Sequence, residues 1–411
     1  MSRAAAAPSL QGSRLLREGA WVAGGQAIAV AAALVGTRLL TEAVSPEVYG
    51  TVALLAGAVV LLLNLFCSPL FQAILRYFPE ADEDALRGTA TRYLRPAVGL
   101  LALALAAAGA LAGAPLLGLL LSVLLVAETV RGFGQSFLLA ARRQRRAAVW
   151  QAAEAWGRPL AAVLCAAFFG PTPSAVLGGY GAATLLIAAL CRRAAAAAPP
   201  HANLGAAMMR YARPLAPLAV VGWIATAGDR YILGGTVGLA EAGIYAVCYG
   251  LVGRPLLIGF GILNQTLRPV YFDAVARGAQ DEIDRYFRVW MRGALAVGCG
   301  GVAVAAAGSG LLAALLLAEP FRGGAQLMPW IALGHAALLV AYVYEGRLFA
   351  RKRTRSILLA QGLGAAAALA ITFPMVRAHG LIGAAAACPI AFGFQALVTA
   401  RLAREERGRC K

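Results

Sequence analysis

The stretch WIATAGDRYILGGTVGLAEAGIYA, residues 223–246, organises the interpretation of the whole chain. It begins as an apolar helix, carries the adjacent charges Asp229 and Arg230, and then meets Gly234 and Gly235. We expect the helix to break at these two glycines and a second helix to follow. An acid and a base inside an apolar helix of membrane-crossing length are costly unless they are paired or face a polar cavity.

A related pattern lies earlier in the chain. There an apolar run ends at Arg38 and is followed by TEAVSPEVYG and a second long apolar run. Gly50 and Gly243, like Gln72 and Gln265, are separated by 193 positions and take equivalent places in the two runs. These matches predict that the chain consists of two copies of one membrane unit.

The composition excludes an ordinary soluble protein. Of the 411 residues, 60% are hydrophobic and 14% are charged, whereas soluble domains are about 25% charged. Apolar stretches of about 20 residues, each long enough to cross a bilayer of roughly 30 Å, recur along the whole sequence. The run 293–331 also allows one helix followed by a re-entrant turn. We predict an all-α polytopic membrane protein with about twelve spans, at 15–41, 46–78, 91–112, 115–141, 145–169, 174–191, 207–235, 239–270, 285–310, 322–350, 355–376 and 380–402.

The distribution of lysine and arginine predicts the orientation. Thirty of these residues fall in the termini and in the loops after even-numbered spans, whereas the opposite loops contain only Arg322 and Arg377. Under the positive-inside rule both termini therefore face the cytoplasm. The same rule explains the net charge of +18, so no nucleic-acid partner is expected.

The segment CRRAAAAAPPH, residues 191–201, divides the chain into two halves. We predict two pseudo-symmetric six-helix bundles, 1–191 and 206–411, joined by a cytoplasmic linker at 192–205. The second bundle ends in a basic cytoplasmic tail. Repeated halves that are related by an axis along the membrane normal place a substrate site between them, near mid-depth.

Several short motifs resemble one family of membrane transporters. VSPEVYGTVALL followed by a helix that ends in ILRYFPEA resembles the first helix pair of bacterial polysaccharide-export flippases. GDRYILGGTVGLAEAGIYAVCYGL resembles their seventh and eighth helices, and ARKRTRS and GLIGAAAA are similar to later segments. The chain thus resembles the Wzx-type polysaccharide or O-antigen flippases of the multidrug/oligosaccharidyl-lipid/polysaccharide (MOP) exporter superfamily.

The resemblance implies a MATE-like pair of bundles that alternates between inward-open and outward-open states. It implies movement of undecaprenyl-diphosphate-linked oligosaccharide from the cytoplasmic to the outer leaflet of the bacterial inner membrane, for lipopolysaccharide or exopolysaccharide. The partners that it implies are this lipid-linked oligosaccharide and the bilayer. A polysaccharide polymerase and other export proteins are further candidates.

Arginines inside the predicted spans are candidates for contacts with a diphosphate headgroup. Intramembrane arginine tends to face a bundle interior or a water-filled cavity, and its guanidinium suits bidentate contacts with phosphate. Arg254 is the first candidate, because it has no acid at helical spacing. Arg38 and Arg230 take equivalent places in the two halves. The alternative interpretation is that both side chains extend to the outer membrane interface and contact no substrate. The full set is Arg254, Arg38, Arg230, Arg158 and Arg131.

Three acids inside the predicted spans are candidates for ion coupling. Glu128 and Arg131 are three residues apart, and Glu154 and Arg158 are four apart, so each two residues share one helical face. Both are explained as structural ion pairs, or else Glu128 or Glu154 is a proton-coupling carboxylate that lines the cavity. Asp229 is the third candidate.

Other classes of function are left with less support. The sequence contains no phosphate-binding Gly-x-x-x-x-Gly-Lys-Ser/Thr motif and no long outer loop for an active site, so an enzyme is not expected. Seven scattered cysteines and three histidines show no metal-ligand spacing, so neither metal nor cofactor is expected. The alternatives are a cation-coupled multidrug exporter or a peptidoglycan-precursor flippase of the same superfamily, or a non-transporting envelope-assembly protein.

Overall fold

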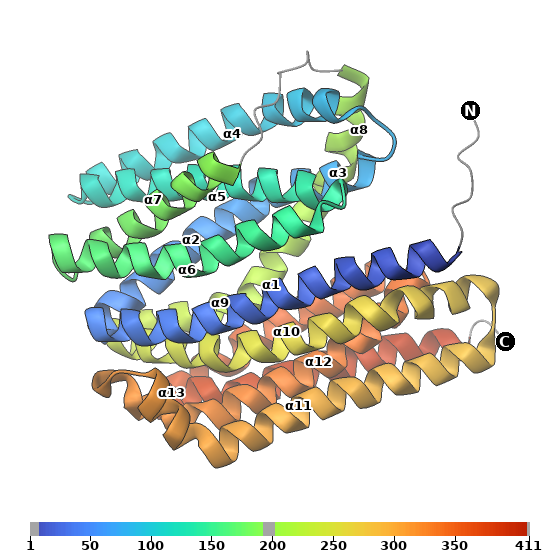
Figure 1. Cartoon of the computed structure of the whole chain (residues 1–411). Helices are drawn as coiled ribbons and strands as arrows, with labels where there is room; N and C mark the ends of the chain where they lie inside the picture. Colours follow the sequence, from blue (N-terminus) through green and yellow to red (C-terminus); the bar gives the residue numbers. More distant parts are fainter. Residues whose placement is uncertain (1–7, 192–201, 409–411) are drawn as a thin grey trace. The chain divides into compact units, whose positions relative to one another are not determined.

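The computed structural model describes residues 8–191 and 202–408, in which every regular element is a helix (Figure 1). Within these ranges ten helical segments are long and apolar enough to cross a membrane. The first half of the chain contains α1 (Pro8–Ala43), α2 (Pro46–Phe66), α3 (Ser68–Tyr77), α4 (Glu83–Leu111), α5 (Pro115–Ala140), α6 (Gln144–Phe169) and α7 (Pro173–Cys191). The second half contains α8 (Ala202–Ala212), η1 (Arg213–Leu215), α9 (Ala216–Thr236), α10 (Leu239–Arg277), α11 (Gln280–Leu316), η2 (Glu319–Leu327), α12 (Met328–Ala350) and α13 (Thr354–Gly408).

Two details bring the number of crossings in the described ranges to twelve. α13 consists of two helices that meet at Gly380, whose backbone has φ 56° and ψ −131°. This left-handed conformation favours glycine. α9 carries two charges, yet its 21 residues extend about 30 Å at roughly 1.5 Å per residue, enough to cross a bilayer. The predicted all-α polytopic fold is therefore confirmed.

The break predicted at Gly234 and Gly235 is present but lies slightly later in the chain. Both glycines are helical, and α9 ends instead at Thr236, just before Gly238 with φ 153°. A Cβ on Gly234 would lie 2.7 Å from Leu54 Cδ1. The missing side chain at Gly234 thus permits close packing against α2, so this glycine indicates helix contact rather than helix termination.

The second and seventh spans are each divided near a proline. The helix predicted over 46–78 ends at Phe66, and α3 resumes at Ser68 with a proline in its first turn. A short 3-10 turn, η1, likewise separates α8 from α9. Proline lacks the N–H that an uninterrupted helix needs, which explains both divisions. The run 293–331 covers the last part of α11, the 3-10 turns of η2 and the first residues of α12.

Packing divides the chain into two compact units, whose bounds differ from those of the two predicted bundles. Residues 37–61, the last part of α1 and most of α2, pack with the second half of the chain. The predicted bundles 1–191 and 206–411 stay a prediction. Of the predicted linker 192–205, residues 192–201 lie outside the described part of the chain, and α8 begins at Ala202. Within the described ranges, the first unit comprises 8–36, 62–170, 174–191 and 202–216, and the second comprises 37–61, 171–173 and 217–408.

In the first unit, α4 and α5 lie side by side and meet through two glycines. A Cβ on Gly109 would lie 2.5 Å from Gly118 Cα, and one on Gly118 would lie 2.8 Å from Gly109 Cα. Membrane helices approach closely through small residues because lipid provides no hydrophobic force between them. At the other end of this unit, α3 packs against α8, where the rings of Tyr77 and Tyr211 meet edge to face.

In the second unit, the starts of α2 and α10 cross at two glycines in equivalent places of the sequence repeat. A Cβ on Gly50 would collide with the carbonyl oxygen of Leu239, and a Cβ on Gly243 would collide with that of Pro46. The contact is therefore reciprocal, backbone against backbone. It explains why glycine stands at both positions, 193 residues apart.

Candidate substrate and coupling sites

The first unit contains a network of two acids and two arginines on α5 and α6. Glu128 accepts from Arg131 Nε at 2.7 Å and from Arg158 Nη1 at 2.5 Å. Arg131 Nε also lies 3.6 Å from Glu154 Oε2. Both acids are buried, at 5% and 6% exposure, whereas the guanidinium groups are half-buried. The network therefore presents donors rather than carboxylates to its accessible side.

Only one of the two predicted ion pairs is present. Glu128 and Arg131 pair within α5 as predicted, but Arg158 pairs with Glu128 on the neighbouring helix rather than with Glu154. Trp150 explains the difference, because its Nε1 donates to Glu154 Oε1 at 2.8 Å. Trp150 lies one helical turn before Glu154, whereas Arg158 lies one turn after it, so this hydrogen bond directs the carboxylate away from Arg158. The four groups thus form one cross-helix network instead of two local pairs.

The second unit holds a different cluster, in which an acid and a base are separated by aromatic rings. Asp229 Oδ2 accepts from the Tyr245 hydroxyl at 2.6 Å, and Asp229 Oδ1 accepts from the Arg230 backbone N–H at 2.8 Å. The Arg230 side chain turns the other way and lies 4.6 Å from the ring centroid of Tyr249. His335 also contacts this ring, edge to face, with centroids 4.8 Å apart.

The neighbours Asp229 and Arg230 therefore do not form a side-chain ion pair. Adjacent residues of a helix project about 100° apart, which separates the two side chains. A small cavity of about 20 Å³ adjoins Asp229 and is bounded by α9 and both halves of α13. This volume has room for about one water molecule. The cavity lining includes Thr372 and Cys388.

Arg254 is exposed on α10. It makes neither a hydrogen bond nor an ion pair with the rest of the described chain. Its guanidinium and that of Arg230 both lie within electrostatic reach of the Tyr49 hydroxyl. The second unit thus brings two arginines, 24 positions apart in the sequence, to one neighbourhood. Neither has a carboxylate partner within ion-pair distance among the described residues.

Arg38, the predicted counterpart of Arg230, has a different environment. Its Nη1 donates to the carbonyl oxygen of Leu317 at 2.5 Å, and its Nη2 pairs with Glu42 at 2.5 Å. It therefore satisfies a carbonyl group just beyond the end of α11, close to the Thr41 hydroxyl, which accepts from Ala318 N at 3.1 Å. These contacts favour a structural role for Arg38.

Comparisons with known proteins identify the architecture. The structure is similar to the lipid II flippase MurJ in an inward closed conformation, with a TM-score of 0.72 and 11% identity over 93% of this chain and 86% of MurJ. It is equally similar to an inward-facing multidrug resistance MATE family transporter of the MOP superfamily, with a TM-score of 0.72 and 12% identity over 92% and 94% of the two chains. A MOP superfamily transporter from Pyrococcus furiosus matches with a TM-score of 0.56 and 14% identity, over 97% and 92%.

This chain shares its fold with these transporters. The predicted MATE-like architecture is thereby confirmed, although identities of 11–14% establish the fold alone. No protein-family model and no protein of curated function matches the sequence. The narrower resemblance to Wzx-type flippases stays a prediction.

Sequence reasoning missed one buried acid of this MOP fold. Glu345 on α12 is 5% exposed and accepts from the amide groups of Gln361, at 3.3 Å, and Gln395, at 3.4 Å. These amides come from the two halves of α13, so Glu345 joins three helices. The sequence signal for it is a single acid within the tenth predicted span, with no base three or four residues away to mark it as one of a pair.

In the described ranges no group of three or more His, Cys, Asp or Glu side chains has the arrangement of a metal site. The contacts that the two clusters make are hydrogen bonds, ion pairs and cation–π contacts. Half-buried guanidinium groups suit an anionic ligand, and the small cavity at Asp229 suits a water molecule or a proton.

Proposed function

We propose that this protein is a flippase for a polyprenyl-diphosphate-linked oligosaccharide. It moves this lipid from the cytoplasmic to the outer leaflet of a bacterial inner membrane, by alternating access and without covalent chemistry. The observation that carries the proposal is Arg254, an exposed guanidinium on a membrane-crossing helix with no carboxylate partner in the described chain.

An unpaired arginine in this position needs an anionic partner. A charged side chain within the bilayer costs at least about 2.5–3.5 kcal/mol on insertion scales, so it is retained for a function or faces water. A diphosphate has several oxygens that can accept hydrogen bonds from the planar guanidinium group of arginine. Arg230, on α9 of the same unit and without an ion-pair partner in the described chain, is a second candidate for contact with this group.

The network in the first unit is suited to a supporting role. Its two acids and two arginines balance in charge, and the half-buried donors of Arg131 and Arg158 remain accessible on one side. We therefore assign these two arginines to secondary contacts with phosphate or sugar oxygens. Arg38 is a weaker candidate, because its donors already bind Leu317 and Glu42.

The fold supports a transporter of amphiphiles. One protein of similar fold is a lipid II flippase and another is a multidrug transporter, so the fold accommodates either kind of substrate. A polysaccharide polymerase and other export proteins remain proposed partners, from the sequence resemblance.

A second candidate function is a cation-coupled multidrug exporter. Asp229 favours it, since this acid has no side-chain ion pair and adjoins a small cavity. Among the three proposed coupling acids, Asp229 fits best. Glu128 already binds two arginines, and Glu154 is held by Trp150 and Arg131.

The decisive experiment is flipping of a labelled undecaprenyl-diphosphate oligosaccharide in proteoliposomes. We expect Arg254→Ala to reduce the rate at least about tenfold, the loss that corresponds to one charge-assisted contact of about 1.4 kcal/mol or more. Arg254→Lys should retain part of the rate, because lysine keeps the charge and loses the fork. Arg285→Ala, an exposed arginine at the cytoplasmic end of α11, is the matched control and should behave like the wild type.

The other outcomes separate the candidates. Equal rates for Arg254→Ala and wild type would remove Arg254 from the site. Preferential transport of lipid II would indicate a peptidoglycan-precursor flippase. Efflux of cationic dyes driven by an ion gradient, without lipid flipping, would establish the exporter, and Asp229→Asn should then abolish that efflux.

A further inference from the structure

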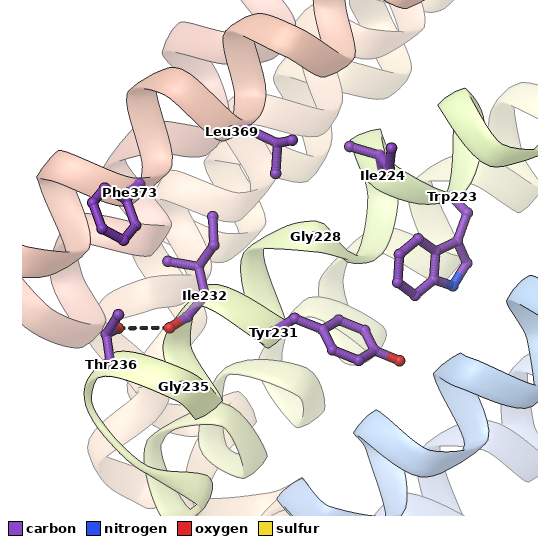
Figure 2. Close-up of a pocket in the computed structure, with 9 residues that line it drawn as sticks. All are labelled: Trp223, Ile224, Gly228, Tyr231, Ile232, Gly235, Thr236, Leu369 and Phe373. Carbon is purple, nitrogen blue, oxygen red and sulfur yellow. Dashed lines mark hydrogen bonds between the residues drawn. The ribbon is translucent and has the colours of Figure 1, made fainter.

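An open apolar groove lies on the membrane-crossing surface of the second unit. Its volume is about 480 Å³. Seven of the residues that line it belong to α9, and two belong to the first half of α13 (Figure 2). They are Trp223, Ile224, Gly228, Tyr231, Ile232, Gly235, Thr236, Leu369 and Phe373.

Every polar side-chain atom in this lining already has a partner. Trp223 Nε1 donates to Gly57 O at 2.9 Å, and the Tyr231 hydroxyl donates to Leu54 O at 2.6 Å. The Thr236 hydroxyl donates to Ile232 O at 2.6 Å, as Figure 2 shows. A ligand in the groove therefore finds apolar surface and no free side-chain donor or acceptor.

The aromatic wall of the groove is held in place before any ligand arrives. The hydrogen bonds from Trp223 and Tyr231 anchor both rings to α2, and the ring centroids are 4.9 Å apart. Binding to a preorganised wall avoids the entropic cost of ordering its side chains. This fixed aromatic wall distinguishes the groove from a flexible helix surface that bilayer lipids contact without specificity.

Gly235 of α9 leaves an open notch in the floor of the groove, and Gly228 leaves a narrower one that Leu369 borders closely. A Cβ on Gly235 would meet no atom within 4 Å, and a Cβ on Gly228 would lie 3.2 Å from Leu369. The two positions are seven residues apart, two turns of the same helix face. Flat rings beside notches suit a narrow chain with planar double bonds and methyl branches.

The polar groups of α9 lie next to the groove in sequence but on other faces of the helix. Arg230, which precedes Tyr231, has a buried Nε without a hydrogen-bond partner. Ile224 and Leu369 line both the groove and the small cavity at Asp229. One helix thus offers apolar surface on one side and a guanidinium on another, the complement of an apolar chain with an anionic head.

We propose that this groove binds the polyprenyl chain of the lipid substrate during its passage. The inference rests on the proposed function, which supplies the polyprenyl lipid, and adds the site at which the chain is held. Trp223 and Tyr231 contact the chain, while arginines such as Arg230 and Arg254 contact the diphosphate.

The test uses a photoreactive polyprenyl phosphate, with a diazirine in its terminal isoprene units, in proteoliposomes that contain the full-length protein. Mass spectrometry of the wild type should place adducts on α9 and the first half of α13. Unlabelled polyprenyl phosphate should compete, whereas excess phospholipid should not.

Gly235→Leu should lower this labelling about tenfold, because its side chain displaces at least two chain carbons from the groove. Gly222→Leu is the matched control, since it makes the same change in α9 where a Cβ also meets open space. It should label like the wild type. In flipping experiments Gly235→Leu should slow a long-chain diphosphate lipid but not a two-isoprene analogue.

The two proposals fail in different ways. Flipping by the wild type with adducts elsewhere would overturn the groove and leave the flippase standing. Adducts at the groove without flipping would support the chain site and overturn the flippase. Competition by phospholipid as effective as by polyprenyl phosphate would show only surrounding bilayer lipid and would overturn the chain site.

Discussion

At the scale of single residues, burial and partners decide which charges are structural. Glu128 is buried and accepts from two arginines on two helices, whereas Arg254 is exposed without a partner in the described chain. Removing one member of a buried network leaves the other charges uncompensated, and this is more destabilising than the pair was stabilising. Stability measurements therefore separate the structural charges from the functional ones.

Glu128→Gln tests this at the network. We expect the free energy of unfolding to fall by about 2–3 kcal/mol, somewhat below the effect for a fully buried pair, because Arg131 and Arg158 are half-buried. The measurement is the apparent Tm and the denaturant midpoint in detergent. Glu80→Gln, which removes an exposed pair with Arg76, is the control and should leave both midpoints unchanged. Equal midpoints for Glu128→Gln and wild type would show that the network contributes nothing to stability.

At the scale of helices, glycines mark either a turn or a close approach. Gly238 and Gly380 lie where the chain reverses, with positive φ. Gly50 and Gly243 are helical and permit backbone contact between α2 and α10. A glycine-to-alanine change in a helix therefore raises the free energy of unfolding where the new Cβ enters open space, and lowers it where the Cβ collides with the backbone of a neighbouring helix.

Gly243→Ala and Gly250→Ala compare these two effects on one helix. Alanine gains roughly 1 kcal/mol of helix propensity over glycine at either position. At Gly250 a Cβ meets no atom within 4 Å, whereas at Gly243 it collides with Pro46 O. We expect Gly243→Ala to lower the free energy of unfolding by about 1–3 kcal/mol through overpacking. Gly250→Ala should be neutral or stabilising, and a lower Tm for Gly250→Ala than for Gly243→Ala would contradict the crossing.

At the scale of the whole molecule, charge asymmetry determines orientation. Thirty basic residues lie in the termini and the loops on one side, and two lie on the other. The number of crossings within residues 8–191 and 202–408 is even, which agrees with the predicted cytoplasmic position of both ends. The predicted orientation therefore specifies, for every loop, the side of the membrane on which it lies.

Substituted cysteines test it, in a background from which the native cysteines are removed. Glu319→Cys, in η2, should react with a membrane-impermeant maleimide in intact spheroplasts. Lys352→Cys, between α12 and α13, should react only after permeabilisation. Both positions are exposed, so protection reports the membrane rather than burial. Reaction of Lys352→Cys in intact spheroplasts would reverse the proposed orientation.

The sequence alone determined the class, the number of crossings and the equivalence of Gly50 and Gly243, and it predicts the orientation. These properties follow from transfer free energies and from patterns within one or two helical turns, so they are readable without knowing what packs against what. The position of the α9 break, the partner of Arg158 and the helix junction at Glu345 were decided only by the tertiary structure. Each depends on atoms from segments far apart in the chain, such as Leu54 against Gly234 or Gln395 against Glu345. Hydropathy and helical spacing describe which face a residue occupies, but packing alone selects the neighbour that it meets there.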